Sequence, residues 1–210
     1  MKVKDKLIDL SSLIESDEVG TWEKQQAGFL QNRVIIFDNG VDDAALRDIS
    51  AWILQWNMED INLQKKDREP ITIIIHSYGG DMYVAGNIID VIKASETPVR
   101  TIGLGLIASA SYLIYLAAPE RYAFTNSIFL QHDGGIDLSN SNNKAKDTMK
   151  FFDLMNNRVR QFILDNTTMT EEQYDANIDR EWYMYADQAK DLGLVHKIIG
   201  EDITLKQIFK

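Results

Sequence analysis

A chain of 210 residues is long enough to bury a sizeable core and is expected to form a single domain. Its net charge of −10 argues against a general affinity for nucleic acid or for anionic membranes, because both attract basic surfaces. The absence of cysteine excludes disulfides, thiolate metal sites and a cysteine nucleophile, and it fits a reducing compartment. The first residues contain no long apolar run of the kind found in signal peptides, so the cytoplasm is the expected location.

Residues 1–32 are mostly polar and acidic, with a short amphipathic stretch between Leu7 and Ile14. One interpretation is an arm that packs on a partner or lines an entrance. The other, which we favour, is a loosely held terminus, since the ends of domains are commonly poorly ordered. From residue 33 onward the chain contains no repeat and no domain linker.

Strand and helix signals alternate after residue 33. Apolar, β-branched runs predict strands at 33–38, 71–76, 99–104, 121–124, 128–131 and 194–199. Helices are predicted at 43–57, 82–95 and 144–166, with shorter ones after Ser109, near Thr170 and at 186–192, and with extended chain at 179–185. Asp42 is expected to cap the first helix and Gly193 to end the last. Three strand–helix units, then a hairpin, then helices indicate an α/β fold with a mainly parallel sheet and right-handed crossovers.

The helix predicted at 144–166 is unusually long. Its apolar residues recur at intervals of three and four, and it follows a Ser/Asn-rich stretch at 136–143 that is flexible in character. Such a helix is uncommon in a closed monomer, so we expect it to project as an interaction element.

The stretch from Thr101 to Pro119 joins a β-prone run to a helix-like run and places Ser109 and Ser111 at the join. Enzymes of the α/β class often carry a nucleophile on such a turn. The turn exposes one side chain, and the helix N-terminus offers unpaired N–H groups to a developing anion. Both hydroxyls are therefore candidate nucleophiles.

Of the three histidines, His132 has the position that best suits catalysis. It ends a predicted strand just before a Gly-Gly turn, and catalytic groups collect at such strand ends in open α/β sheets. Paired with Ser109, its imidazole would take the hydroxyl proton and return it to the leaving group. His76 is interpreted as a hydrogen-bonded turn residue and His196 as a surface residue.

The turn Tyr78-Gly79-Gly80 follows a predicted buried strand. Its backbone N–H groups would suit an oxyanion, whereas the alternative is a tight turn that simply requires glycine. It lacks both the Gly-Lys-Ser/Thr end of a P-loop and the three-glycine dinucleotide fingerprint. No His, Asp or Glu cluster has metal-ligand spacing, so we expect no metal and no other cofactor in this chain.

Five segments in order carry a resemblance: RVIIF, IIIHSYGGDMYVAGNIID, TIGLGLIASASYLIYLAA, RYAFTNSIFLQHDGG and YMYADQAKDLGLVHKI. From about Arg33 to Ile199 the chain resembles the ClpP family, the proteolytic subunits of the Clp protease. The resemblance implies a ClpP/crotonase-like α/β fold, with a mainly parallel sheet, βα repeats and a projecting long helix. It divides the chain into an N-terminal arm at 1–32, a peptidase domain at 33–200 and a C-terminal tail at 201–210.

The resemblance also implies a serine endopeptidase. Ser109 would be the nucleophile, His132 the general base, and the backbone N–H groups of Gly80 and Ala110 the oxyanion hole. Family members form two stacked rings of subunits, usually heptameric, into which an AAA+ unfoldase feeds unfolded proteins. ATP would be used by that partner, the long helix would mesh the rings, and the N-terminal arm would lie near the axial pore.

Several positions depart from the family pattern. The family's Ser-Pro-Gly-Gly reads Ser-Tyr-Gly-Gly at residues 77–80, and the preceding Asn is His76. After the nucleophile, Ser-Met-Gly reads Ser-Ala-Ser at residues 109–111. The Gly-Gln-Ala segment that supports contact between the rings is replaced by an Asn/Ser tract.

The largest departure concerns the acid of the triad. Counting back from Ala186, Glu181 falls where the family has Asp. A Glu can hold the imidazole tautomer as an Asp does, although its extra methylene requires a shifted backbone. Asp179 is the alternative acid, and a chain without a working acid is the third possibility. Asp133 is disfavoured because successive strand residues point to opposite faces.

The leading hypothesis is an ATP-dependent, self-compartmentalised serine endopeptidase subunit. A non-catalytic or regulatory ClpP-like ring subunit is the first alternative, because the acid is altered and the ring-contact segment is missing. A phage prohead-maturation-type protease is the second. A crotonase-type acyl-CoA enzyme is an alternative on fold alone.

Overall fold

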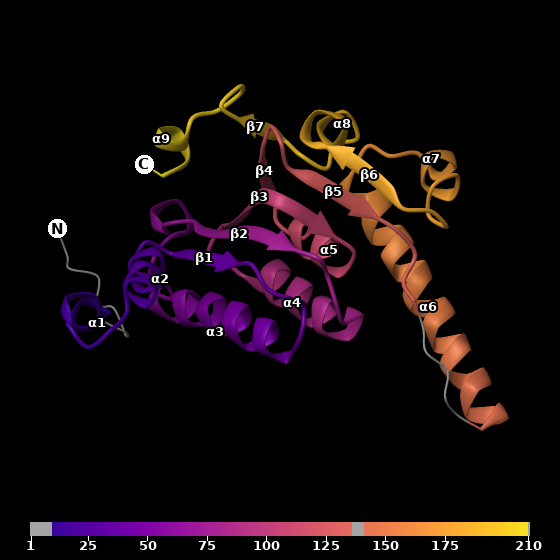
Figure 1. The fold of residues 1–210 in the computed structure, drawn as a ribbon, viewed down its shortest axis with the longest axis horizontal. Helices are drawn as coiled ribbons and strands as arrows, with labels where there is room; N and C mark the ends of the chain where they lie inside the picture. The colour runs from indigo at the N-terminus through magenta and orange to yellow at the C-terminus, as the bar shows by residue number, and fades with distance from the viewer. Residues whose placement is uncertain (1–9, 136–140, 210) are drawn as a thin grey trace.

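The computed structural model describes residues 10–135 and 141–209, in which one seven-stranded sheet organises an α/β fold (Figure 1). Five strands lie in the order β1-β2-β3-β4-β7 and run parallel: β1 (Val34–Phe37), β2 (Ile71–Ser77), β3 (Val99–Ala108), β4 (Glu120–Phe124) and β7 (Lys197–Ile199). In addition, β5 (Ile128–Gln131) pairs in parallel with β3, and β6 (Trp182–Tyr185) pairs antiparallel with β5. The predicted fold class, an α/β fold with a mainly parallel sheet, is confirmed.

The main core lies between the sheet and three helices that alternate with its first strands. These are α3 (Asp43–Glu59), α4 (Met82–Ala94) and α5 (Ala110–Leu116). As predicted, Asp42 caps α3, because its carboxylate accepts the N–H groups of Ala44 and Ala45. Gly193, with a φ of +72°, follows α8 (Ala186–Asp191), also as predicted. The other face of the sheet carries a smaller cluster, in which Ile208 of α9 (Leu205–Ile208) is buried.

The N-terminal segment is helical where the structure describes it. α1 (Ser11–Glu15) is followed by α2 (Thr21–Gln31), and Ala27 of α2 is 3% exposed. The start of the amphipathic stretch noted above falls in residues 1–9, outside the described residues. None of the helices in the described ranges combines the length and the apolar character that crossing a membrane requires.

The long helix α6 (Asn142–Asn166) projects from the body of the fold, with its N-terminal end farthest away (Figure 1). It is anchored near its C-terminal end, where Ile163 is buried in the main core. α7 (Glu171–Asp175) follows, with Thr170 as its hydroxyl cap. Most of the Ser/Asn-rich stretch that we expect to be flexible falls in residues 136–140, outside the described residues.

The predicted hairpin between the fourth and fifth strands is wrong. Both strands run parallel to β3: β4 pairs with residues 100–103 and β5 with residues 106–108. β3 changes neighbour around Gly105, which has a φ of +86°. There the Nδ1 of His76 accepts the N–H of Leu106 at 3.0 Å, so His76 is hydrogen-bonded as expected, but it lies within β2 and not in a turn. The chain therefore does not reverse direction between β4 and β5: the two strands pair in parallel with successive parts of β3.

Arg121 on β4 is expected to be a main determinant of stability. Its buried guanidinium donates hydrogen bonds of 2.7–3.1 Å to four backbone carbonyl oxygens, those of Ala118, Asn166, Gly193 and Leu194. An Arg121→Met variant should lose at least about 3 kcal/mol of unfolding free energy, because one hydrogen bond to a charged group contributes about 1.5–3 kcal/mol. Urea denaturation checks this result, with Arg180→Met as the control, since the Arg180 side chain is 75% exposed. Equal losses in the two variants would contradict the assignment.

His196 is expected to make the fold less stable below about pH 6.5. His196 is exposed, as expected, but its Nδ1 accepts the backbone N–H of Arg121 at 3.3 Å. Partial burial of the ring, together with the charge of Arg121, lowers the pKa of His196 from its usual value of 6.5. The unfolded chain therefore binds the proton more readily. The stabilisation is complete above the unfolded-state pKa and is lost as the pH falls through the folded-state pKa. The carboxyl pKa values of Asp175 and Asp202 are lowered from 3.8, so their effects appear at more acidic pH.

The measurement is the thermal unfolding midpoint between about pH 7 and about pH 5. The midpoint should fall with pH in the natural chain. It should fall less in His196→Asn, whose amide oxygen replaces the acceptor without titrating. The same pH dependence in both proteins would exclude His196 as the cause.

Candidate active site

Ser109 lies between β3 and α5, on what we call the nucleophile turn (residues 108–111). Its φ of +55° and ψ of −126° are strained for a residue with a side chain, and such strain is concentrated at functional sites. Its backbone N–H donates to the carbonyl of Leu130 at 3.0 Å, which ties the turn to β5, while α5 is buried along its length. The hydroxyl of Ser109 is half-buried and makes no hydrogen bond to the described residues. A rigid turn thus presents an unengaged hydroxyl.

Ser111, the other candidate nucleophile, is fully buried. Its Oγ accepts the N–H of Ala108 at 3.0 Å. The same oxygen lies 2.8 Å from the carbonyl oxygen of Ala108 and 3.0 Å from that of Ser77, either of which can accept its proton. A hydroxyl that is shielded from solvent and engaged with the backbone is not available for attack, so the geometry favours Ser109.

His132 and Glu181 face each other across the pair of strands β5 and β6. The antiparallel register pairs Gln131 with Trp182, so the next residues along the two chains are His132 and Glu181. The Nδ1 of His132 lies 3.3 Å from the Oε1 of Glu181, with side-chain exposures of 27% and 58%. The alternative acid, Asp179, pairs instead with Arg180 at 3.8 Å, and its side chain is 74% exposed.

The second ring nitrogen of His132, Nε2, is buried and has no hydrogen-bond partner among the described residues. Ser109 and His132 line the same cavity. In the part of the chain that the structure describes, no hydrogen bond joins the Oγ of Ser109 to the Nε2 of His132. Catalytic hydrogen bonds are often long without substrate and tighten when it binds. Nε2 is therefore the nitrogen left available for a hydroxyl proton.

The turn at residues 77–80, which we call the oxyanion turn, touches the nucleophile turn. Gly79 has a φ of +91°, and a Cβ there would lie 2.7 Å from the Cβ of Ser109 and 3.0 Å from the amide nitrogen of Ala110. Val41 donates to the carbonyl of Gly79 and accepts the N–H of the residue after Gly80, a pattern that leaves the N–H of Gly80 unused. The N–H of Ala110 also has no acceptor among the described residues. Two unpaired N–H groups on adjacent turns are the donors that an oxyanion hole requires.

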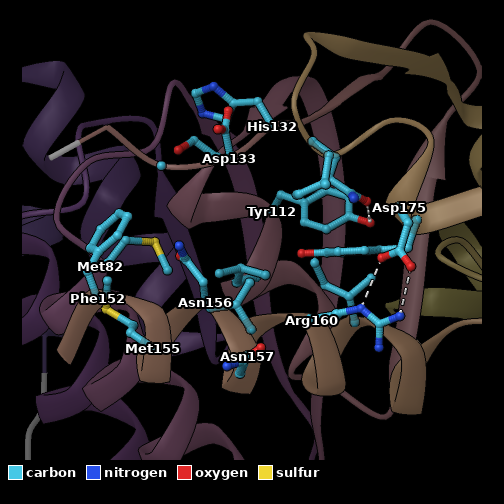
Figure 2. Close-up of a pocket in the computed structure, with 18 residues that line it drawn as sticks. Met82, Tyr112, His132, Asp133, Phe152, Met155, Asn156, Asn157, Arg160 and Asp175 are labelled. Atoms are coloured by element: carbon cyan, nitrogen blue, oxygen red, sulfur yellow. Dashed lines mark hydrogen bonds and ion pairs between the residues drawn. The ribbon is translucent and has the colours of Figure 1, made fainter. Parts of the chain in front are cut away.

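A cavity of about 300 Å³ opens beside Ser109 and His132. Figure 2 shows His132 at its upper edge, Met82, Phe152 and Met155 on one side, and the ion pair of Arg160 with Asp175 on the other. Most of its apolar lining comes from α4, α5 and α6, with Ile178 added from the chain after α7: Met82, Leu113, Phe152, Met155, Val159, Ile163 and Ile178. An apolar cavity of this kind, beside the candidate nucleophile Ser109, suits an apolar side chain of a ligand.

Arg160 forms ion pairs on the polar side of this cavity. It bonds Asp175 at 3.1 Å and Glu171 at 2.9 Å, which joins α6 to α7. The hydrogen bond to Asp175, followed by that to Glu171, raises the pKa of Arg160, and the hydrogen bond from Arg160 lowers the pKa of Asp175. Because the guanidinium is already engaged by two carboxylates, it forms a wall of the cavity and is not a free cation for substrate.

A buried hydrogen bond that the sequence does not reveal links α5 and β5. The hydroxyl of Tyr112 donates to the Oε1 of Gln131 at 3.0 Å, which links the helix after Ser109 to the residue before His132. Burial raises the pKa of the Tyr112 phenol, so the hydroxyl remains a donor. The sequence does place a Gln next to the candidate base His132, at the end of a predicted buried strand. It does not identify Tyr112 as the hydrogen-bond partner of that Gln.

Comparisons with known proteins extend over most of the chain. A family profile described as Clp protease matches residues 16–202. The ATP-dependent Clp protease proteolytic subunit 2 of Pseudomonas aeruginosa is 31% identical over 84% of this chain and 86% of its own length. The protein of the same name from Treponema denticola is 30% identical over 81% and 83%.

Among solved structures, a ClpP1 variant from Listeria monocytogenes is similar with a TM-score of 0.73 and 25% identity. The similarity covers 89% of this chain and 99% of that one. The profile match begins within the N-terminal segment and ends beyond β7, so it includes every residue of the site described above. The chain therefore belongs to the Clp protease family.

Proposed function

We propose that this chain is the proteolytic subunit of an ATP-dependent Clp-type serine endopeptidase, with Ser109, His132 and Glu181 as its triad. One observation carries the proposal. The Nδ1 of His132 lies 3.3 Å from the Oε1 of Glu181, and its Nε2 has no hydrogen-bond partner among the described residues. His132 and Ser109 line the same cavity. Membership of the Clp protease family supports peptide-bond hydrolysis as the reaction.

The first half of the reaction forms an acyl-enzyme. The Oγ of Ser109 attacks the carbonyl carbon of the peptide bond, and the Nε2 of His132 takes the hydroxyl proton. The carbonyl oxygen becomes an anion that accepts hydrogen bonds from the N–H groups of Gly80 and Ala110. As the C–N bond breaks, His132 returns the proton to the leaving amine.

The second half releases the acyl group. Water attacks the ester carbon, His132 takes a proton from the water, and Ser109 recovers its proton as the ester bond breaks. Glu181 accepts the Nδ1–H of His132, which keeps the Nε2 free of a proton at the start and stabilises the imidazolium during each transfer. The hydroxyl of Tyr183, 3.3 Å from the other carboxylate oxygen, holds Glu181 in place.

Assembly and partner form the second part of the proposal. The projecting α6, with Met149, Phe151 and Leu154 exposed, suits contact with other copies of the chain in two stacked rings. Relatives named as ATP-dependent proteolytic subunits support an AAA+ unfoldase as the partner that uses ATP and delivers unfolded proteins. The cytoplasmic location and the absence of a cofactor in this chain stay predictions.

A non-catalytic ring subunit is the alternative that particular observations favour. Glu181 is 58% exposed, and the hydrogen bond between Ser109 and His132 is not formed among the described residues. Such a subunit would copurify with an active homologue, and Ser109→Ala would leave the activity of the complex unchanged. A prohead-maturation-type protease differs in another way, since its activity would not require an ATPase.

The test combines assembly with activity. We expect the purified chain to have the mass of a ring assembly in solution and to cleave short fluorogenic peptides by itself. It should degrade an unfolded protein only with an AAA+ unfoldase and ATP. A monomer, or a ring that cleaves peptides only when a second ClpP-like subunit is present, would overturn the proposal.

A further inference from the structure

We propose that Ser111 is a positioning residue, whose hydroxyl fixes the nucleophile turn against the oxyanion turn. The inference rests on the proposed function. Ser111 lies on the first turn of α5 and is fully buried, so it does not touch substrate. Its effect on the reaction would be exerted through the relative positions of Ser109 and the N–H of Gly80.

The contacts of Ser111 join the two turns directly. Its Oγ accepts the N–H of Ala108 at 3.0 Å, on the residue just before the nucleophile. It lies within donating distance of the carbonyl of Ser77, at 3.0 Å, at the start of the oxyanion turn. When its proton goes to that carbonyl, one hydroxyl connects the end of β2 to the end of β3.

Ser77 continues this connection into the oxyanion turn. Its hydroxyl donates a hydrogen bond to the carbonyl oxygen of Asn39 at 2.6 Å. The same hydroxyl oxygen accepts a hydrogen bond from the N–H of Gly79 at 3.2 Å. The two serines therefore form a chain of contacts from the residue before Ser109 to the residue before Gly80. Both are buried, which strengthens their hydrogen bonds relative to the same bonds in water.

The pairing of β2 with β3 is irregular just before the two turns. The register shifts between Ile75 and Ser77, and a single pair, Ser77 with Ile107, follows the shift where the turns begin. The turns nevertheless approach closely, since a Cβ on Gly79 would lie 2.7 Å from both the carbonyl oxygen of Ala108 and the Cβ of Ser109. A small displacement of one turn would change the direction from the Oγ of Ser109 to the oxyanion donors.

The test is Ser111→Ala, which leaves the N–H of Ala108 and the carbonyl of Ser77 without this partner. We expect kcat for a fluorogenic peptide to fall by about 10- to 100-fold, the size of effect produced by small misplacements of catalytic groups. KM should change little, because the substrate cavity is intact. The affinity for a peptide boronate, which forms a tetrahedral adduct with the nucleophile, should fall in parallel with kcat.

Ser127→Ala is the matched control. Ser127 is also buried, and its hydroxyl donates to the carbonyl of Gly103 at 2.7 Å, but Ser127 is not among the residues that line the cavity. It should lose stability without losing boronate affinity. Thermal unfolding of both variants separates the loss of a buried hydrogen bond from the loss of alignment.

The outcomes separate this inference from the proposed function. An active natural chain whose Ser111→Ala variant keeps its kcat and boronate affinity, or loses no more than Ser127→Ala, overturns the inference alone. A natural chain that neither cleaves peptides nor binds the boronate overturns the proposed function, and the inference with it. A selective loss of kcat and boronate affinity in Ser111→Ala, with KM preserved, supports the positioning role.

Discussion

Replacing Ser109 by alanine is expected to lower kcat for peptide hydrolysis by about 10⁴-fold or more, the loss seen when the nucleophile of a serine triad is removed. The physical reason is that the other candidate hydroxyl, that of Ser111, does not take its place, because it is buried and bonded to the backbone. Initial rates with a fluorogenic peptide measure the effect. Residual activity within tenfold of the natural chain would contradict the assignment of Ser109.

A Ser109→Gly variant supplies the control for folding. It should be as inactive as Ser109→Ala but more stable by about 1 kcal/mol or more, because glycine adopts the strained backbone angles of this turn at little cost. Urea denaturation of the two variants compares their stabilities. Equal inactivity with unequal stability would separate the chemical role of the side chain from the strain at φ +55°.

Removing the carboxylate of Glu181 is expected to have the second largest effect. Glu181→Ala should lower kcat by about 10³- to 10⁴-fold, because the acid of a triad sets the imidazole tautomer and stabilises the imidazolium. Asp179→Ala is the matched control, two residues away and 74% exposed, and its kcat should stay close to that of the natural chain. Steady-state kinetics over a range of substrate concentrations separates kcat from KM.

Two further results would decide between the possible acids. If kcat fell strongly in Asp179→Ala and not in Glu181→Ala, Asp179 would be the acid of the triad. The contact of 3.3 Å between His132 and Glu181 would then have no catalytic role. No loss in either variant would indicate a dyad without an acid. Glu181→Gln should be nearly as impaired as Glu181→Ala, since the amide removes the charge that stabilises the imidazolium.

Much of the architecture follows from local sequence patterns. Helical spacing and the Asp42 cap place α3 correctly, and the β-branched run at 71–76 corresponds to β2. The position of Glu181 follows from counting along the family pattern, and the register of β5 with β6 then places it across from His132. Sequence patterns near the ends of predicted strands can therefore point to residues that the fold places side by side.

Other features depend on contacts between distant parts of the chain. The split of β3 between two neighbours depends on the bend at Gly105, and short strands with a short connection are equally typical of a hairpin. The bond of Tyr112 to Gln131 and the contacts of Ser111 join residues whose proximity exists only in the folded state. Periodicity describes which side of an element is buried, but it does not identify the partner of a buried polar group.

Covalent labelling with a fluorophosphonate, followed by peptide mapping, tests the central claim most directly. The reagent needs an activated serine beside an oxyanion hole, so we expect stoichiometric modification of Ser109 in the assembled chain. Labelling should be greatly slowed in His132→Ala and absent in Ser109→Ala. An unmodified chain, under conditions that label an active ClpP, would contradict the assignment of Ser109 and His132 as a working catalytic pair.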